Sequence, residues 1–236
     1  MKWNKYRVDN IKKEYLFKFL SEENINRFLD TGDIWFSRAD RFGDKMECVR
    51  VSDLKRDPVD ENKIESRKKR TLISCWHLTD DESLAMWDTY SKTKLERKVC
   101  AIRFSVKHLN ELIKSTSPDF SAAKLKRNVY GRIVYRNISS FKDLDTKKVK
   151  YSAFRKEKAF QYESEYRYVT QLNGEFHAEG LNYKLGKPSG LSFNILINPL
   201  LSKDDYSRLM SKFLNGNHSS KVKESHLVNW VKPAEW

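Results

Sequence analysis

Apolar and polar residues alternate along the chain in short blocks, and the periods of these blocks predict short strands and short helices. Tyr15–Leu20 is an aromatic-rich run with the composition of a strand, and residues 34–36 form a second such run. Between them, apolar residues recur at helical spacing after Ser21, a good N-cap residue, and stop at Gly32. The first forty residues therefore predict a strand, a helix and a strand.

The same patterns continue to the end of the chain. Thr79 to Glu82 has the form of a capping box in front of a helix, and Ser202 precedes a second amphipathic helix. Further strands are predicted at residues 71–76, 99–104, 129–135, 166–172 and 191–198. This mixture predicts one α+β domain over residues 1–236.

One stretch, residues 53–70, contains almost no large apolar side chains and ends in a run of four basic residues. Such composition predicts a flexible surface insertion.

Composition narrows the class of protein. The 46 Lys and Arg residues against 32 Asp and Glu residues give a net charge of +14. No apolar run has the roughly 18 residues that a membrane span needs, and the N-terminus has no apolar core of a secretory leader. Three scattered cysteines do not form a disulfide framework, and Cys75 and His77 have no second pair at metal-ligand spacing. We expect a cytoplasmic protein without a resident metal.

The sharpest local pattern is Glu163-Ser-Glu165-Tyr-Arg167. Because side chains on a strand alternate between its two faces, Glu163, Glu165 and Arg167 are predicted to share one face. Two carboxylates beside a guanidinium suit acid–base chemistry. The alternative is a solvated strand face with an ordinary ion pair.

Other segments also have two interpretations. Trp87 and Tyr90 would either pack in the core or offer a stacking face to a ligand. Asp40, Asp44 and Glu47 would either bind a metal or be solvated in a polar loop.

These motifs occur together in one order that resembles the bacterial domain-of-unknown-function family 2971 over nearly the whole chain. The motifs are Leu16-Phe-Lys-Phe-Leu20, Gly32-Asp-Ile-Trp-Phe-Ser37, Phe42-Gly-Asp44 with Glu47, Ser74-Cys-Trp76, Met86-Trp-Asp-Thr-Tyr90 and Glu163-Ser-Glu165-Tyr-Arg167. That family in turn resembles ADP-ribosyltransferases, which carry a basic residue or His on the first strand, a Ser-containing strand and a later Glu-x-Glu. Lys18, Ser74 and Glu163-Ser-Glu165 follow that order.

The resemblance implies an ADP-ribosyltransferase-like fold with a split, mostly antiparallel sheet, and NAD as the co-substrate. It assigns to Glu165 the stabilisation of the positive charge that develops on the ribose, and to Glu163 the orientation or deprotonation of the acceptor. The residues it implies for NAD binding are Lys18, Arg38, Ser74, Trp87 and Tyr90.

The distribution of charged residues along the chain indicates which kind of molecule accepts the ADP-ribose. Residues 124–158 contain twelve basic and three acidic residues, a net +9, with aromatic residues interleaved. This composition is typical of nucleic-acid binding, and the aromatics favour single-stranded RNA over DNA. The candidate contacts are Lys126, Arg127, Arg132, Lys147, Lys148, Lys150 and Arg155. The alternative is a solvated basic face.

We therefore expect an NAD-dependent ADP-ribosyltransferase that modifies nucleic acid, as a bacterial toxin or phage-defence effector with an antitoxin or inhibitor protein as partner. Two alternatives stay open. One is a non-catalytic nucleic-acid-binding module. The other is a Mg²⁺-dependent nuclease with Asp44, Glu163 and Glu165 as ligands.

Overall fold

The computed structural model describes residues 2–7, 12–50, 53, 58–91, 99–116, 125–137 and 152–231. Contacts within the chain define two compact units, each built from three segments. The first unit comprises Met1–Ile11, Ile34–Trp76 and Thr116–Tyr183, and the second comprises Lys12–Asp33, His77–Ser115 and Lys184–Trp236.

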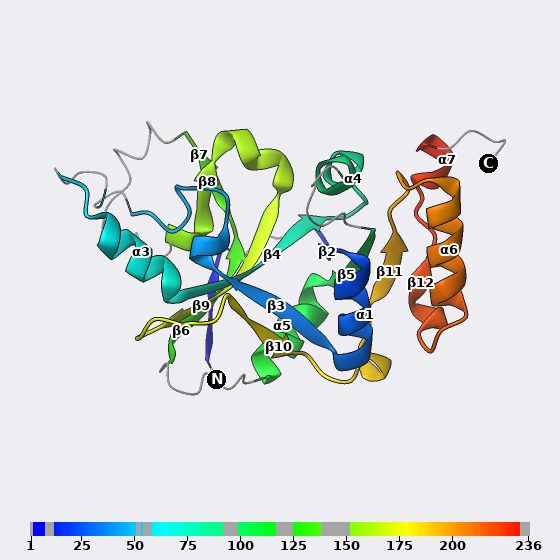
Figure 1. Cartoon of the computed structure of the whole chain (residues 1–236), viewed down its shortest axis with the longest axis horizontal. Coiled ribbons are helices and arrows are strands. Elements are labelled where there is room, and N and C mark those ends of the chain that lie inside the picture. Colours follow the sequence, from blue (N-terminus) through cyan, green and yellow to red (C-terminus); the bar gives the residue numbers. More distant parts are fainter. Residues whose placement is uncertain are drawn as a thin grey trace. The chain divides into compact units, whose positions relative to one another are not determined.

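The strands confirm the α+β class and form a mixed, mostly antiparallel sheet (Figure 1). Its ten strands are β1 (Trp3–Tyr6), β2 (Tyr15–Leu20), β3 (Asp33–Arg38), β4 (Thr71–Thr79), β5 (Cys100–Ser105), β6 (Leu125–Arg132), β9 (Glu165–Leu172), β10 (Gly180–Lys184), β11 (Asn194–Ile197) and β12 (Val222–Lys223). Two further strands, β7 (Val134–Arg136) and β8 (Arg155–Glu157), form a separate parallel pair.

The helices are short, as the sequence predicts. The α-helices are α1 (Glu22–Thr31), α3 (Glu61–Lys69), α4 (Leu84–Ser91), α5 (Val106–Ser115), α6 (Lys203–Leu214) and α7 (Val228–Val231). The 3₁₀ helices are η1 (Ala39–Arg41), η4 (Lys158–Glu163), η5 (Pro188–Gly190) and η6 (Ser219–Lys221). None of the described helices is long and apolar enough to cross a membrane.

In the first unit, β6 lies between β1, to which it is parallel, and β9, to which it is antiparallel. Gly131 of β6 approaches β1 so closely that a Cβ there would lie 1.6 Å from the carbonyl oxygen of Tyr6. Strand β9 is buried along almost its whole length, and its inward aromatic residues Tyr166 and Tyr168 pack edge to face, with ring centroids 5.5 Å apart. The strand that begins at Glu165 is thus a core strand.

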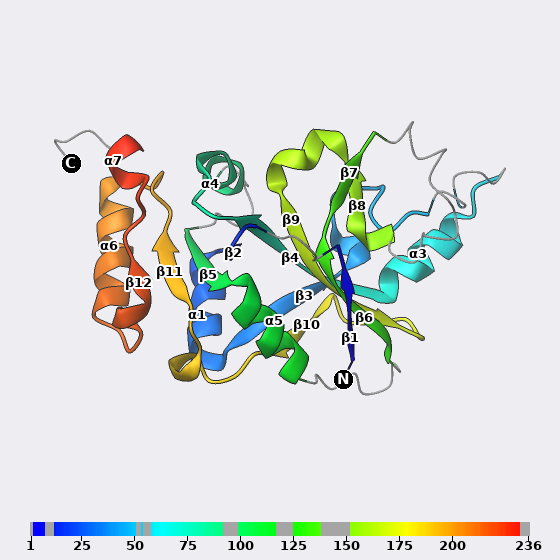
Figure 2. The same ribbon diagram turned by 180° about the vertical axis from the view of Figure 1, so that it is seen from behind.

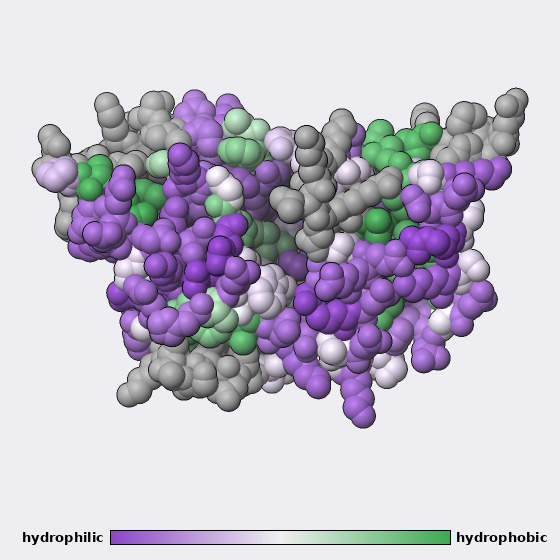
Figure 3. Space-filling model, viewed as in Figure 1, coloured by the Kyte–Doolittle hydropathy of each residue, from purple (hydrophilic) through white to green (hydrophobic). Residues whose placement is uncertain are grey.

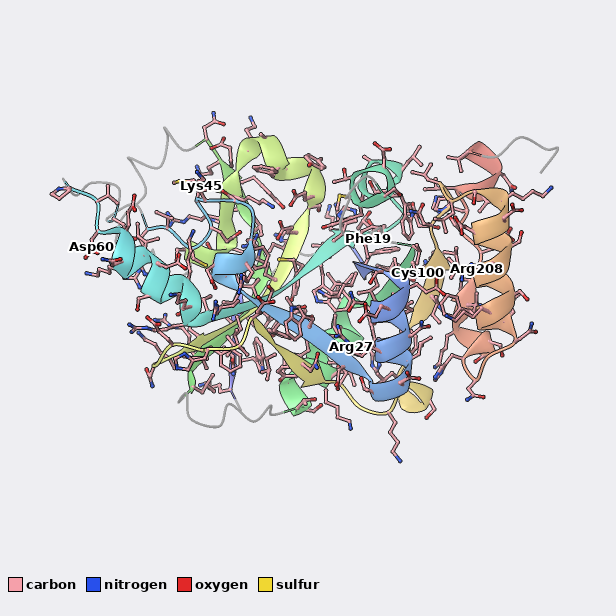
Figure 4. The ribbon with its side chains drawn as sticks, in the orientation of Figure 1. Phe19, Arg27, Lys45, Asp60, Cys100 and Arg208 are labelled. Atoms are coloured by element: carbon pink, nitrogen blue, oxygen red, sulfur yellow. The ribbon has the colours of Figure 1, made fainter. Side chains whose placement is uncertain are left out.

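In the second unit, β2 pairs antiparallel with β5 and with residues 77–79 of β4, and β11 extends this sheet from β5. Helix α1 begins where the Ser21 hydroxyl accepts the Asn24 amide and ends at Gly32, whose φ of +73° is left-handed. Both ends agree with the sequence prediction. Arg208 of α6 pairs with the Glu22 carboxylate of α1 at 2.8 Å (Figure 4).

The predicted capping box at Thr79 to Glu82 is wrong. Strand β4 continues through Thr79, which pairs with Tyr15, and the hydroxyl that accepts an amide of α4 is that of Ser83. Helix α4 begins only at Leu84, five positions after Thr79, so the Thr79 hydroxyl lies too early in the chain to cap it and accepts the amide of Asp81 instead.

Residues 53–70, the predicted flexible insertion, contain the regular helix α3. The Asp60 side chain accepts the amide of Lys63 at its start (Figure 4), and no residue of the helix is buried. At its other end, Arg67 forms an ion pair with Asp53. The flexibility of this segment stays a prediction.

Candidate functional site

Five charged side chains of the first unit form a continuous set of ion pairs, which we call the buried charge network: Glu47, Lys156, Glu163, Glu165 and Arg167. The exposed fraction of these side chains ranges from 0% for Arg167 to 16% for Glu163. The alternative interpretation of a solvated strand face is therefore wrong.

Arg167 is the centre of the network. Its Nη1 and Nη2 donate to the two Glu47 oxygens at 2.5 and 3.0 Å, and its Nε donates to Glu165 Oε2 at 2.6 Å. A further bond joins Nη1 to the carbonyl oxygen of Ala153. A guanidinium has five donors in a rigid fork, so these contacts fix the position of the Glu165 carboxylate.

Lys156 joins the two carboxylates of the Glu-x-Glu motif. Its Nζ lies 2.5 Å from Glu163 Oε2 and 2.7 Å from Glu165 Oε1. It also lies 4.7 Å from the centre of the Phe160 ring, within cation–π distance. Each oxygen of Glu165 thus contacts a different cation.

The prediction that Glu163 shares a strand face with Glu165 is wrong in its geometry. Glu163 ends η4, the helical segment that connects β8 to β9 (Figure 2), and strand β9 begins at Glu165. Ser164 between them has a left-handed φ of +42°. The two carboxyl groups still meet, because this turn and Lys156 hold them together.

The surroundings of the two carboxyl groups shift their pKa values in opposite directions. Burial and a hydrogen bond with Glu165 raise the pKa of Glu163 to about 7. Burial alone would raise the pKa of Glu165 as well, but Arg167, the hydrogen bond with Glu163 and Lys156 hold it well below its usual range. Near neutral pH, Glu165 is ionised and Glu163 can take up or release a proton.

Tyr135 of β7 supports the start of β9. Its hydroxyl oxygen accepts the backbone N–H of Glu165 at 2.7 Å. Burial, with the nearby Glu165 carboxylate, raises the pKa of Tyr135. The phenol therefore stays protonated and can donate its own hydrogen.

Two predicted NAD contacts of the first unit are occupied by protein groups. The buried Ser74 hydroxyl accepts Trp76 Nε1 at 3.2 Å. Arg38 donates to both oxygens of Asp40 and to the carbonyl oxygens of residues 176–178. Their predicted roles gain no support from this placement.

The other predicted NAD contacts belong to the second unit. Trp87 is fully buried, lies edge-on to Phe19 with centroids 4.7 Å apart, and donates its Nε1 to Glu82. The Tyr90 ring stacks on Phe19 at 4.9 Å, and Lys18 pairs with Ile102 in the sheet. Trp87 thus packs in the core, which is the alternative to a stacking face for a ligand.

The basic stretch is described in part. Lys126, Arg127 and Arg132 lie on β6, where Lys126 is exposed and the other two are half-buried. Arg155 on β8 is half-buried and donates to the carbonyl oxygen of Val49. The candidates Lys147, Lys148 and Lys150 lie outside the described residues.

Comparison with known families adds one finding. Residues 86–168 match the family model of DUF2971, proteins of unknown function. The DUF2971 match covers Lys156, Glu163 and Glu165 but stops short of the nearly full-length resemblance that the motifs suggest. No curated protein and no solved structure matches the chain. No comparison links the DUF2971 segment to ADP-ribosyltransferases.

Sequence reasoning missed Lys156 as a member of the site and placed Glu47 only among metal candidates. Neither has a local signal, because Glu47 lies 120 positions from Arg167, and Lys156 lies 7 and 9 positions before Glu163 and Glu165 in a stretch with many other basic residues. Within the described residues, no group of three His, Cys, Asp or Glu side chains is placed to hold a metal ion.

Proposed function

We propose that the protein is an NAD-dependent ADP-ribosyltransferase with an ADP-ribosyltransferase-like fold, and that it modifies nucleic acid. One observation carries the proposal. Two carboxyl groups in contact share a lysine, and their environments hold one ionised and give the other a pKa of about 7. Pairs of carboxyl groups with separated pKa values divide charge stabilisation and proton transfer between them in enzymes that act at sugar carbons.

Each residue of the pair has one role in the proposed transfer. The bond between nicotinamide and C1′ of the ribose breaks, the bonding electrons leave with nicotinamide, and a nucleophile of the acceptor forms the new bond to C1′. Glu165, ionised and fixed by Arg167, stabilises the positive charge that develops on the ribose. Glu163 accepts the proton that the acceptor loses.

The basic composition supports a nucleic-acid acceptor. The net +9 of residues 124–158 includes Lys156, which touches both carboxylates, so the acceptor-binding stretch reaches the site itself. RNA is the favoured acceptor because exposed bases can stack on aromatic side chains. In a cell, such an enzyme would act as a toxin or defence effector in the cytoplasm.

Labelled NAD tests this proposal. The parent protein is incubated with labelled NAD and with RNA, DNA or protein in parallel, and transfer of label to nucleic acid is expected. Glu165→Gln should lower turnover by roughly a hundredfold or more while NAD affinity changes little, because it removes the charge but keeps the shape. The matched control is Glu179→Gln, which removes a carboxylate from an exposed pair with Arg41 in the same unit.

The results separate the proposal from its alternatives. Unchanged stability of the native protein at saturating NAD, together with salt-dependent binding of nucleic acid, would support the non-catalytic binding module. Nucleic-acid cleavage that a chelator abolishes would support the nuclease. Label only on protein would reject the nucleic-acid acceptor.

A further inference from the structure

Four arginines of the first unit gather around one short segment of chain, on the opposite side of β8 from the buried charge network. Asp53 belongs to this segment and contacts two of these arginines. Its Oδ2 accepts the backbone N–H of Arg50 at 2.9 Å, and its two oxygens pair with Arg67 Nη1 and Nη2 at 2.5 and 3.0 Å. Arg155 reaches the same segment, where its Nη2 donates to the carbonyl oxygen of Val49 at 2.9 Å.

Arg127 of β6 completes the set, because it lies close enough to Arg50 to interact with it electrostatically. We call Arg50, Arg67, Arg127 and Arg155 the arginine cluster. Four guanidiniums and the single carboxylate of Asp53 leave a charge of +3 on these five side chains. Like charges at this density repel one another unless an anion lies between them.

Within the described part of the chain, these guanidiniums are partly removed from water, and Asp53 forms an ion pair with one of them, Arg67. Burial and the neighbouring Arg67 lower the pKa of Arg50, and burial lowers the pKa of Arg155. Arg50 Nε is buried and has no hydrogen-bond partner among the described residues. Anion binding is most favourable where a hydrogen-bond donor is already desolvated and lies among positive charges.

We propose that the arginine cluster is a phosphate-binding site, whose occupant is a phosphodiester or pyrophosphate group. Guanidiniums bind phosphate oxygens in pairs, and arginine is the residue suited to this geometry. Arg50 and Arg67 lie outside the basic stretch of residues 124–158, so the site joins distant parts of the sequence. The inference does not depend on ADP-ribosyl transfer.

The surroundings of the cluster agree with a polar ligand. Helix α3, which carries Arg67, has no buried residue, and the surface over it is mostly hydrophilic (Figure 3, left). Arg155 and Lys156 are consecutive on β8 and point to opposite sides of it, toward the cluster and toward the carboxylates respectively. A phosphate on Arg155 would therefore lie one residue along β8 from Lys156, which contacts both candidate catalytic carboxylates.

The first test uses the parent protein and inorganic phosphate or pyrophosphate, with chloride at the same ionic strength as the reference. Phosphate should raise the melting temperature above the chloride value. The double variant Arg50→Gln/Arg127→Gln should bind phosphate at least about tenfold more weakly, because two charge-assisted hydrogen bonds are lost. Arg70→Gln is the matched control, an exposed arginine whose Nη2 contacts Ser66.

Parallel titrations with NAD and with a single-stranded oligonucleotide identify the source of the phosphate. Weaker NAD binding by the double variant would assign the site to the pyrophosphate, and weaker oligonucleotide binding would assign it to the nucleic-acid backbone. Stabilisation by phosphate no greater than by chloride, or parental affinity of the double variant for all ligands, would overturn the proposal. If the double variant does not fold, the single variant Arg127→Gln is measured instead, because Arg127 is a half-buried side chain on strand β6.

Discussion

The contact between Glu47 and Arg167 allows the most direct test of the buried charge network. Glu47 is 1% exposed and Arg167 is fully buried, and two hydrogen bonds of 2.5 and 3.0 Å join them. Glu47→Gln removes the negative charge but keeps one oxygen that can accept from Arg167. Among the described residues, the Glu165 carboxylate is then the direct counter-charge left for the buried guanidinium.

We expect this substitution to lower the free energy of unfolding by about 3 kcal/mol, the lower end of the range for breaking a buried ion pair, because Gln keeps part of the hydrogen bonding. This is a large share of the roughly 5–15 kcal/mol that stabilises a typical domain. The assay is urea unfolding followed by tryptophan fluorescence and by circular dichroism, because coincident transitions of the two probes test whether the two compact units unfold together.

The matched control is Glu179→Gln, which removes the carboxylate of an ion pair in the same unit. Glu179 lies 2.5 Å from Arg41, but the two side chains are 70% and 49% exposed. Water screens such a pair, so the expected change is below about 1 kcal/mol. Equal effects of the two substitutions would refute the reasoning, because the larger effect is expected from the burial of the Glu47–Arg167 pair.

Two further predictions concern the carboxyl pair and the packing of β1. The folded protein binds the Glu163 proton more tightly than an unfolded chain, whose glutamate titrates near 4.5, so the free energy of unfolding should fall as pH rises from about 5 to about 7 and level off above. Glu163→Gln should remove this fall in thermal melts, while the low pKa of Glu165 affects stability only at more acidic pH. Gly131→Ala should destabilise the first unit by at least about 1–3 kcal/mol and increase hydrogen exchange in β1, since φ is +156° and the added Cβ would strike the Tyr6 carbonyl. Gly174→Ala, where nothing lies within 4 Å, should show neither effect.

Local patterns predicted those parts of the fold that local interactions determine. The start and end of α1 depend on Ser21 and Gly32, which act within four residues of their own positions. The strand over residues 166–172 was predicted from its own apolar run, and β9 confirms it. The capping box failed because a long-range pairing with Tyr15 extends strand β4 to Thr79, and the helix begins only at Leu84, after Ser83.

The site was predictable only in its Glu163-Ser-Glu165-Tyr-Arg167 pattern. The left-handed turn at Ser164 has no signal in the sequence, because left-handed conformations usually require Gly or Asn. Glu47 lies 120 positions from Arg167 in the sequence, and the periodicity of neighbouring residues does not predict contacts at that separation. The sequence pattern therefore identified three of the five members of the network, Glu163, Glu165 and Arg167, and the fold supplied Glu47 and Lys156.

The energetics of the network argue for a role beyond stability. Taking several charges out of water costs more than their attraction returns unless their geometry is favourable, and apolar residues of similar volume often stabilise a fold equally well. What apolar residues cannot do is hold Glu165 ionised while leaving Glu163 with a pKa of about 7. Glu47 and Arg167 maintain that difference indirectly, because Arg167 fixes the charge on Glu165, and this charge contributes to the raised pKa of Glu163. Loss of the pH-dependent fall of stability in Glu47→Gln would connect the two ends of the network, whereas an unchanged fall would make the Glu47–Arg167 pair a purely structural support of β9.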